Sequence, residues 1–280
     1  MKPAPFQMYR PQSLAEGLSI LGDNADDVRV LAGGQSLVPL LNLRLAMPAV
    51  IVDLNRVREL AGIRYEGGML RIGAMTRQQD LLDSPLAVKS APLLQKAVSY
   101  VGHLQTRSRG TVGGSVAHAD PSAELPLALT ALDATLTIAS RRGVREMPVR
   151  SFFRHAMVTE LKPDEIITDI AVQRAGPSQR SSFREFARRR ADFAIVAAAV
   201  VFEPDRAGVV LGGIEATPHL CPTLATALHS GSTRPDMIEA AIDADLAEVE
   251  PNSDIHASGE FRRHLARILL RDSIDNVIMP

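Results

Sequence analysis

Two glycine-bearing segments in the first half of the chain place the strongest constraint on its fold. The first, Ala32-Gly33-Gly34-Gln35-Ser36, follows a strand-length apolar run at 28–31 and precedes an apolar stretch at 37–45. That order predicts a strand, a tight loop and a helix. Paired glycines allow positive φ values and remove the Cβ atoms that would keep a ligand from the backbone. A helix after the loop would add its N-terminal dipole, and Ser36 a hydroxyl donor.

The second segment, Gly110-Thr111-Val112-Gly113-Gly114-Ser115, repeats these glycines and small hydroxyl side chains. We expect it to end a polar loop over residues 102–114. Two backbone nests of this kind can hold a diphosphate from both sides. A glycine pair after a strand is more often only a tight turn, and spacing alone does not decide between a turn and a diphosphate site. Neither matches G-x-G-x-x-G or G-x-x-x-x-G-K-[ST], which disfavours a Rossmann domain and a P-loop.

The composition excludes several classes of protein. With 280 residues, of which 46% are hydrophobic and 22% charged, the chain is long enough for a folded protein with a sizeable core. A net charge of -1 argues against nucleic acid as the main partner. Cys221 is the single cysteine, so we expect neither an internal disulfide nor an iron–sulfur cluster on this chain. The histidines are scattered without a ligand motif, and no metal site is expected.

No stretch approaches the length of a membrane span, since the most apolar run, 194–202, has the length of a strand. The first six residues lack the apolar core of a signal peptide. From these features we expect a cytoplasmic protein.

Local signals predict a mixture of strands and helices. Ser13 is typical of a helix N-cap and Gly22 of a helix end, and Gly67-Gly68 is typical of a hairpin turn. The segment Ala175-Gly176-Pro177-Ser178 predicts a boundary between a domain at 1–176 and a domain at 177–280. The second domain begins with strand patterns and ends with amphipathic helices.

Longer motifs carry a resemblance to a known family. The pattern A-G-G-x-S-L-x-P-x-x-x-x-R occurs from Ala32 to Arg44, and T-x-G-G-x-x-A-x-x-D-P-x-x-x-x-P from Thr111 to Pro126. Both are similar to the FAD-binding signatures of the medium subunit of molybdenum hydroxylases, the xanthine dehydrogenase and aerobic carbon monoxide dehydrogenase family. The similarity extends from Phe6 through the Arg188–Ala194 segment and to the overall length, so it covers essentially the whole chain.

The resemblance implies an α+β fold of the vanillyl-alcohol-oxidase (PCMH) type. Two α+β subdomains would hold FAD between them, and a C-terminal domain of sheet and helices would follow. The two glycine segments would hold the diphosphate, Glu124, Ile167 and Arg184 would lie near the flavin ring, and Phe193 would shield it, although Phe193 is also consistent with a strand core residue. The full set assigned to FAD is Leu31, Ala32, Gly33, Gly34, Gln35, Ser36, Thr111, Gly113, Gly114, Ser115, Ala117, Glu124, Ile167, Arg184 and Phe193.

The resemblance also implies partners. A large subunit would carry molybdopterin and a small subunit two [2Fe–2S] clusters, in a dimer of heterotrimers, and this chain would pass electrons through FAD to NAD, a quinone or oxygen. No side chain of this chain is expected to be catalytic. Gln35 and Ser115 stand where many relatives carry His and Asn, which leaves the substrate subtype open. The alternative is a stand-alone flavin oxidase or reductase of the same fold.

Overall fold

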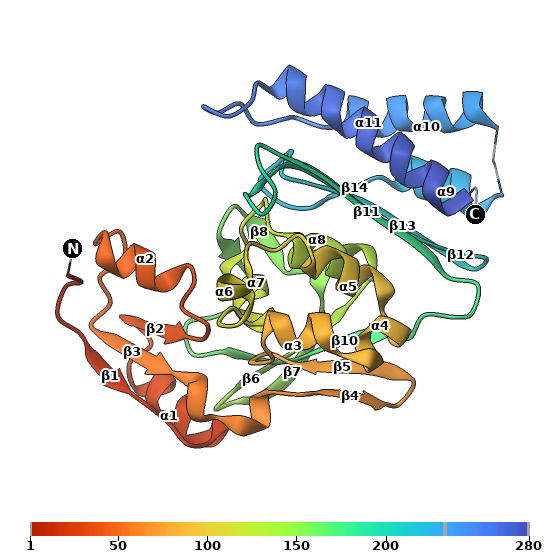
Figure 1. The fold of residues 1–280 in the computed structure, drawn as a ribbon. Coiled ribbons are helices and arrows are strands. Elements are labelled where there is room, and N and C mark those ends of the chain that lie inside the picture. Colours follow the sequence, from red (N-terminus) through yellow and green to blue (C-terminus); the bar gives the residue numbers. More distant parts are fainter. Residues whose placement is uncertain (1, 232–233, 279–280) are drawn as a thin grey trace.

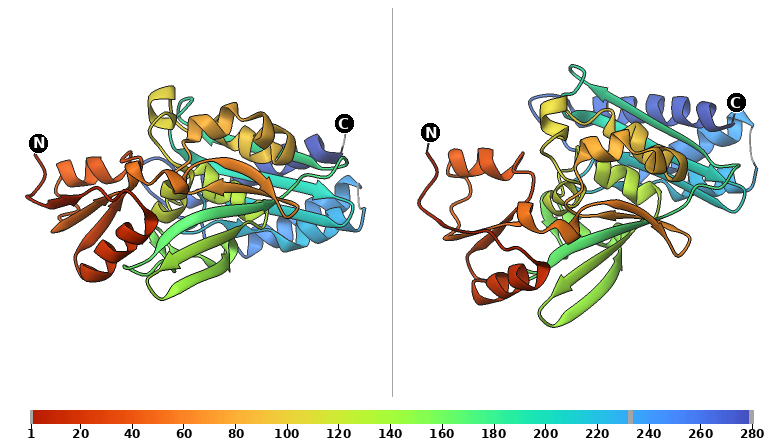
Figure 2. Two further views of the ribbon diagram at one scale, coloured as in Figure 1. Left: turned by 90° about the horizontal axis from the view of Figure 1, so that it is seen from below. Right: turned by 60° about the horizontal axis from the view of Figure 1, so that its bottom comes forward.

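Helices and sheets alternate in layers, and a small lobe formed by the N-terminal residues lies at one side (Figure 1). The structure is a computed structural model and describes residues 2–231 and 234–278. Two further views show the same lobe projecting from the body of the molecule (Figure 2). The short 3-10 helices and the small two-stranded sheet are η1 (Leu54–Arg56), η2 (Arg58–Leu60), η3 (Val149–Ser151), β8 (Phe153–His155) and β9 (Val158–Thr159).

The N-terminal lobe is built on a three-stranded parallel sheet with the order β1-β3-β2. Its central strand, Val-Ile-Val-Asp at 50–53, is buried along its whole length, which explains its continuous apolar run. The Ser13 side chain accepts a hydrogen bond from the Glu16 N–H at 3.2 Å, so the predicted N-cap is confirmed. The elements of the lobe are β1 (Gln7–Tyr9), α1 (Leu14–Asp23), β2 (Val28–Leu31), α2 (Leu37–Asn42) and β3 (Val50–Asp53).

Gly22 does not end the first helix, and that prediction is wrong. α1 continues to Asp23 and is capped by Asn24. A Cβ atom at Gly22 would lie 2.9 Å from the Cδ atom of Arg141, whose guanidinium donates to the Ser19 carbonyl at 2.7 Å. The glycine therefore makes room for a side chain from the neighbouring sheet.

A five-stranded antiparallel sheet forms the floor of the body, with the order β4-β5-β10-β6-β7. Gly67 and Gly68 join its first two strands with φ values of 59° and 81°, so the predicted hairpin is confirmed. Its strands are β4 (Ile63–Glu66), β5 (Met69–Gly73), β10 (Ile166–Gln173), β6 (Thr135–Ser140) and β7 (Gly143–Pro148).

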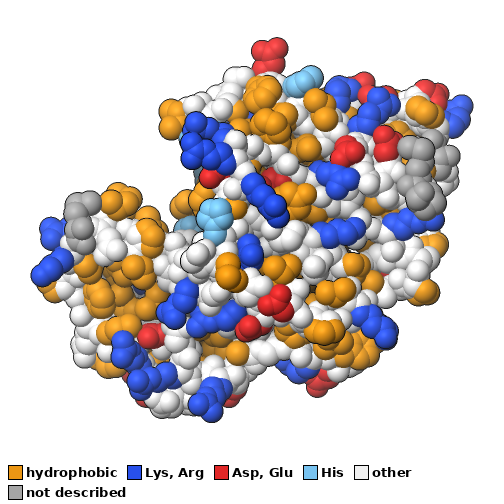
Figure 3. Space-filling view, viewed as in Figure 1, with side chains coloured by type: hydrophobic (Ala, Val, Ile, Leu, Met, Phe, Trp, Pro, Cys, Tyr) orange, Lys and Arg blue, Asp and Glu red, His pale blue; other side chains and the backbone are white. Residues whose placement is uncertain are grey.

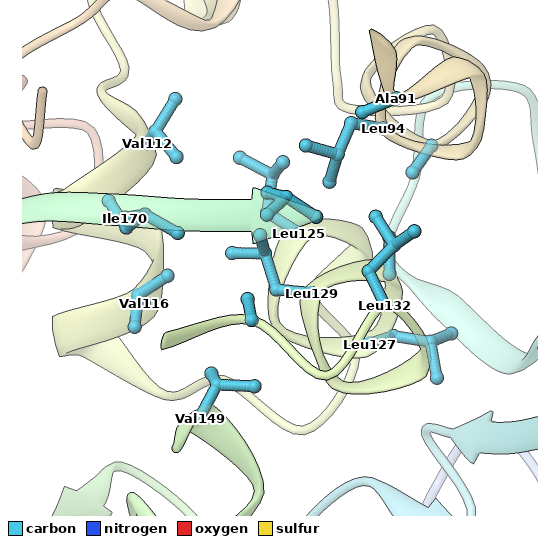
Figure 4. Packing of buried hydrophobic residues seen from close by; sticks show 14 of the residues in the cluster. Ala91, Leu94, Val112, Val116, Leu125, Leu127, Leu129, Leu132, Val149 and Ile170 are labelled. Atoms are coloured by element: carbon cyan, nitrogen blue, oxygen red, sulfur yellow. The ribbon is translucent and has the colours of Figure 1, made fainter. Parts of the chain in front are cut away.

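A layer of short helices packs on this sheet, with α8 at its centre. Every residue of α8 is buried, and Leu125 and Leu129 lie close to Ile170 of β10 in the core (Figure 4). Val112 and Val116 of α7 enter the same core. The helices of this layer are α3 (Gln78–Asp83), α4 (Pro85–Ser90), α5 (Pro92–Val98), α6 (Leu104–Arg107), α7 (Val112–His118) and α8 (Glu124–Ala131).

A second antiparallel sheet, with the order β11-β12-β13-β14, lies on the other side of these helices. Its strand β12 contains the most apolar run of the chain because both of its faces are buried. Ala197 and Ala199 contact the core around α8, whereas Val196 and Ala198 belong to a second core beneath the C-terminal helices. The elements are β11 (Arg180–Ala187), β12 (Ala194–Glu203), β13 (Arg206–Gly212), β14 (His219–Leu220), α9 (Pro222–His229), α10 (Pro235–Ala247) and α11 (Gly259–Ile278).

The predicted division after residue 176 falls in the segment between β10 and β11. Phe183 of β11 shares one core with Leu127 of α8, so the two parts of the chain pack on each other without a solvent gap. The division stays a prediction. Within the described ranges, no helix has the length and apolar character needed to cross a membrane.

Phe183 provides a test of this shared core. Its ring is 1% exposed and lies 5.2 Å, between centroids, from the ring of Tyr100 after α5. We expect Phe183→Ala to lower the free energy of unfolding by roughly 3–5 kcal/mol, because it leaves a cavity between the sheet and the helices. Phe186→Ala on the same strand, where the ring is 40% exposed, should cost only about 1 kcal/mol. Urea unfolding of the two variants measures the difference, and equal losses would contradict the shared core.

Candidate functional site

The first glycine segment presents a row of unused backbone donors. In the described part of the chain, the N–H groups of Gly33, Gly34, Gln35 and Ser36 donate to no protein acceptor. Gly34 has a φ of 74°, which turns the backbone so that successive N–H groups can face one ligand. The segment follows Leu31 at the end of β2. The Ser36 hydroxyl makes no capping hydrogen bond to helix α2, which follows it. These donors suit an anionic group.

The second glycine segment differs from the predicted loop, since α6 and the start of α7 lie within residues 102–114. Thr111 is the N-cap of α7, and its hydroxyl accepts from the Gly114 N–H at 3.1 Å. The Gly113 N–H donates to the Ala74 carbonyl at 2.8 Å, and a Cβ at Gly113 would lie 2.8 Å from the Ala74 Cα. Glycine is weak in helices, which is why the sequence indicated a loop. Gly113 therefore serves close packing and its amide is not free for a ligand.

The fold brings the two glycine segments into contact. A Cβ atom at Gly33 would lie 2.7 Å from the Gly110 Cα and would overlap the carbonyl oxygen of Arg109. A Cβ at Gly114 would lie 3.4 Å from the Cβ of Ala32. Beyond this contact Ser115 and Ala117 of α7 are partly exposed. The surface between the N-terminal lobe and the rest of the molecule is hollowed (Figure 3).

Polar side chains join the backbone around this contact. The Asn55 amide donates to the Ala32 carbonyl at 2.9 Å and accepts from the Arg77 guanidinium at 2.6 Å. The same guanidinium donates to the carbonyl oxygen of Arg109. Asn55 and Arg77 therefore connect one glycine segment to the other.

Two carboxyl groups beyond the second segment, one buried and one partly buried, have raised pKa values. Glu124 begins α8 and is 6% exposed, and burial, followed by the charge of Asp120, raises its pKa to about 7. Burial and then the charge of Glu124 raise the pKa of Glu185 on β11 to about 8. The Oε2 atom of Glu185 is buried and has no hydrogen-bond partner among the described residues. The two carboxyl groups are coupled, because a negative charge on Glu124 opposes ionisation of Glu185.

A cavity of about 350 Å³ opens beside Glu185. Its volume is within the range of small-molecule sites. The guanidinium groups at its edge come from the turn that joins β11 and β12. The lining residues are Ser99, Tyr100, Glu185, Ala187, Arg189, Arg190 and Ala191.

The remaining predicted residues occupy different surroundings. Ile167 is buried in β10, at a register shift between Ile167 and Asp169. Arg184 points to the opposite face of β11 from Glu185, and its guanidinium pairs with Asp272 of α11. Phe193 lies before β12 and is 70% exposed, so the alternative that it is a strand core residue is wrong. The structure thus brings the two glycine segments together, whereas the Arg184 guanidinium pairs with the C-terminal helix.

Sequence reasoning missed Asn55, Arg77 and Glu185. Asn55 and Arg77 lie in segments without a glycine motif, and only tertiary contact joins them to Ala32 and Arg109. One feature of the sequence could have indicated Glu185. Side chains alternate along a strand, so Glu185 lies on the same face of β11 as the buried Phe183.

Family models cover nearly the whole chain. Residues 4–173 match the FAD-binding domain in molybdopterin dehydrogenase, and residues 181–277 match the carbon monoxide dehydrogenase flavoprotein C-terminal domain. The 6-hydroxypseudooxynicotine dehydrogenase complex subunit alpha of Paenarthrobacter nicotinovorans is 36% identical over 98% of this chain and 95% of its own length. The carbon monoxide dehydrogenase medium chain of Hydrogenophaga pseudoflava is 31% identical over 98% of both chains.

Solved structures agree with the family models. The carbon monoxide dehydrogenase of Hydrogenophaga pseudoflava superposes with a TM-score of 0.95 and 30% identity over 99% of this chain and 98% of the other. Quinoline 2-oxidoreductase of Pseudomonas putida 86 gives 0.93 and 34%, over 100% of both chains. The expected α+β fold, a FAD-binding domain followed by a C-terminal domain, is confirmed. The chain therefore belongs to the molybdenum hydroxylase family of oxidoreductases, as its FAD-binding flavoprotein subunit.

Proposed function

We propose that this chain is the electron outlet of a molybdenum hydroxylase complex. When bound, FAD accepts electrons from [2Fe–2S] clusters of a small partner subunit and delivers them to an external acceptor, which is NAD, a quinone or oxygen. A molybdopterin-binding large subunit oxidises the organic or gaseous substrate, and the assembly is a dimer of heterotrimers. The observation that carries the proposal is the row of unused N–H groups from Gly33 to Ser36, beside the second glycine segment.

The donors around the first segment fit the diphosphate of FAD. Backbone N–H groups at a turn with positive φ form an anion-binding concavity, and the Ser36 hydroxyl can add a further donor. The Thr111, Gly113 and Gly114 backbone forms the opposite wall, where packing against Ala74 holds it in place. In our proposal the first segment donates the hydrogen bonds and the second fixes the width of the site.

We assign the flavin ring to the region of Glu124, Ile167 and Phe193. An exposed aromatic ring such as Phe193 can cover a planar ligand at little cost in conformational entropy. Arg184 contributes through its main chain, because its guanidinium is engaged by Asp272 on the far face of β11. No side chain in this region needs to act as a catalytic acid or base.

The carboxyl groups of Glu124 and Glu185 set the charge next to this region. Their raised pKa values favour the protonated form of the pair near neutral pH. A protonated carboxyl group donates a hydrogen bond and adds no negative charge. The chain thereby avoids repulsion of a cofactor whose diphosphate is already anionic.

The alternative, a stand-alone flavin oxidase or reductase, predicts turnover without partners. We expect the purified full-length chain to retain FAD and to be bleached by dithionite, yet to show no turnover with carbon monoxide, aldehydes or N-heterocycles. Adding the two partner subunits should restore substrate-dependent bleaching of the flavin absorbance. Substrate oxidation by the chain alone, at about 1 to 1,000 per second, would establish the alternative instead.

Gly34→Asp tests the diphosphate site. The variant places a carboxylate at the unused N–H groups, so we expect loss of most of the FAD that co-purifies with the protein. Gly67→Asp is the matched control, since Gly67 also has a positive φ but lies in an open hairpin turn with nothing near its Cβ. Gly34→Asn keeps the shape without the charge and should retain more FAD than Gly34→Asp. Equal flavin-to-protein ratios in all three variants would refute the site, and thermal melting checks that each is folded.

The pH dependence of stability tests the raised pKa of Glu185. Because the pKa of Glu185 is raised to about 8 in the folded state, ionisation opposes folding, and stability falls as the pH rises from about 4.5 to above 8. In the flavin-free protein, Glu185→Gln should be close to the wild type at pH 5 and exceed it at pH 9 by about 2 kcal/mol, less than a fully buried carboxyl would give because solvent screens this partly exposed one. Glu146→Gln, on the exposed edge strand β7, should show no such difference. Urea midpoints at the two pH values measure it, and a pH-independent difference would contradict the assignment.

A further inference from the structure

Arg77 connects the two glycine segments through a short chain of hydrogen bonds. Its guanidinium donates to the Arg109 carbonyl on one side and to the Asn55 Oδ1 at 2.6 Å on the other. The Asn55 Nδ2 then donates to the Ala32 carbonyl at 2.9 Å. One arginine side chain and one amide side chain therefore span from the backbone of the first segment to that of the second.

Both ends of this connection are held in place. The Arg77 backbone pairs with Thr111 in an antiparallel bridge, in which the Val112 N–H donates to the Thr76 carbonyl at 3.0 Å and the Gln78 N–H to the Gly110 carbonyl at 2.9 Å. The buried Asp53 carboxylate accepts from the Asn55 backbone N–H at 3.0 Å and from its side-chain amide at 2.5 Å. Because both ends are fixed, the hydrogen bonds through Asn55 and Arg77 determine the distance between the two glycine segments.

The positive charge at this place is only partly offset. Burial, and then the charge of Arg109, lower the pKa of the Arg77 guanidinium, and the charges of Asp80 and Asp53 oppose only part of this effect. Among the described residues, neither Arg77 nor Arg109 forms an ion pair, although eighteen pairs occur elsewhere. Two guanidinium groups without a carboxylate partner among the described residues, one of which is linked through Asn55 to the segment with free N–H groups, favour an anionic ligand.

We propose that Arg77 is a positioning residue for the cofactor diphosphate: it holds the glycine segments at the spacing that the diphosphate needs and, with Arg109, supplies the compensating positive charge. Asn55 transmits this position to the first segment. The inference rests on the proposed FAD site and adds to it a residue outside both glycine motifs. This role explains why the Arg77 guanidinium donates to the Arg109 carbonyl and to the Asn55 Oδ1 instead of pairing with a carboxylate.

The test compares variants of the full-length chain after removal of flavin. We expect Arg77→Met to raise the dissociation constants of FAD and of ADP by roughly 10- to 100-fold, because a charge and two fixed hydrogen bonds are lost. ADP carries the diphosphate without the flavin and so isolates this part of the site. Arg77→Lys keeps the charge but cannot donate to the Arg109 carbonyl and the Asn55 Oδ1 with the geometry of a guanidinium, so it should recover only part of the affinity. Arg58→Met, on the exposed surface of η2, is the matched control and should bind both ligands as the wild type does.

Two readouts separate this role from a merely structural one. Raising the salt concentration should weaken ADP binding less steeply in Arg77→Met than in the wild type, because fewer charges contribute. Asn55→Ala should lower FAD affinity less than Arg77→Met, and the two losses should not add in the double variant, since both act through one connection.

Different failures have different meanings. If the wild type binds FAD and Arg77→Met binds it within twofold, or if the salt dependence is unchanged, the inference is overturned while the proposed site stands. If Arg77→Lys loses as much affinity as Arg77→Met and both melt earlier than Arg58→Met, Arg77 is structural and the inference is again overturned. If the flavin-free wild type binds neither FAD nor ADP, the proposed site itself fails.

Discussion

The close approach of three backbone segments underlies both the fold and the site. Gly33 contacts the Arg109–Gly110 backbone, and Gly113 contacts Ala74, at separations that a Cβ atom would prevent. These contacts join the N-terminal lobe to the five-stranded sheet and to the start of α7. The glycine pairs thus have two functions, since Gly33 and Gly113 permit packing whereas Gly34, with its positive φ, turns free N–H groups outward. A search for glycine motifs detects both functions but does not separate them.

Much of the fold could be predicted from local signals. The Gly67-Gly68 hairpin, the Ser13 cap and the strand-length apolar run at 194–202 depend on neighbouring residues, and the structure has the expected hairpin, cap and strand there. The start of α7 was missed because Gly113 and Gly114 disfavour a helix intrinsically, and the Thr111 cap and packing on Ala74 overcome that preference. Tertiary packing overrode propensity there.

The glycine segments of the candidate site were equally visible in the sequence, whereas its polar surroundings were not. Asn55, Arg77 and Arg109 come from three separated segments, and no pattern within any one of them indicates that they meet. Glu185 acquires its character from burial beside Glu124, which is a property of the folded chain. Arg184 was expected near the flavin ring from the resemblance, but its guanidinium pairs with Asp272 of the C-terminal helix. The direction of a side chain on a strand depends on register, and register depends on the whole sheet.

The arrangement also links cofactor binding to folding. The core of the N-terminal lobe joins the body through few residues, among them Met75, Ala139 and Ile166. A ligand held between the first glycine segment, which belongs to the lobe, and the second, which belongs to the body, adds its binding free energy to this same junction. Because such a ligand binds the folded chain and not the unfolded one, it stabilises the junction in proportion to the logarithm of its concentration. In the site we propose, the fixed connection through Asn55 and Arg77 would lower the cost of that binding, since the two walls would be at their final spacing before the ligand arrives.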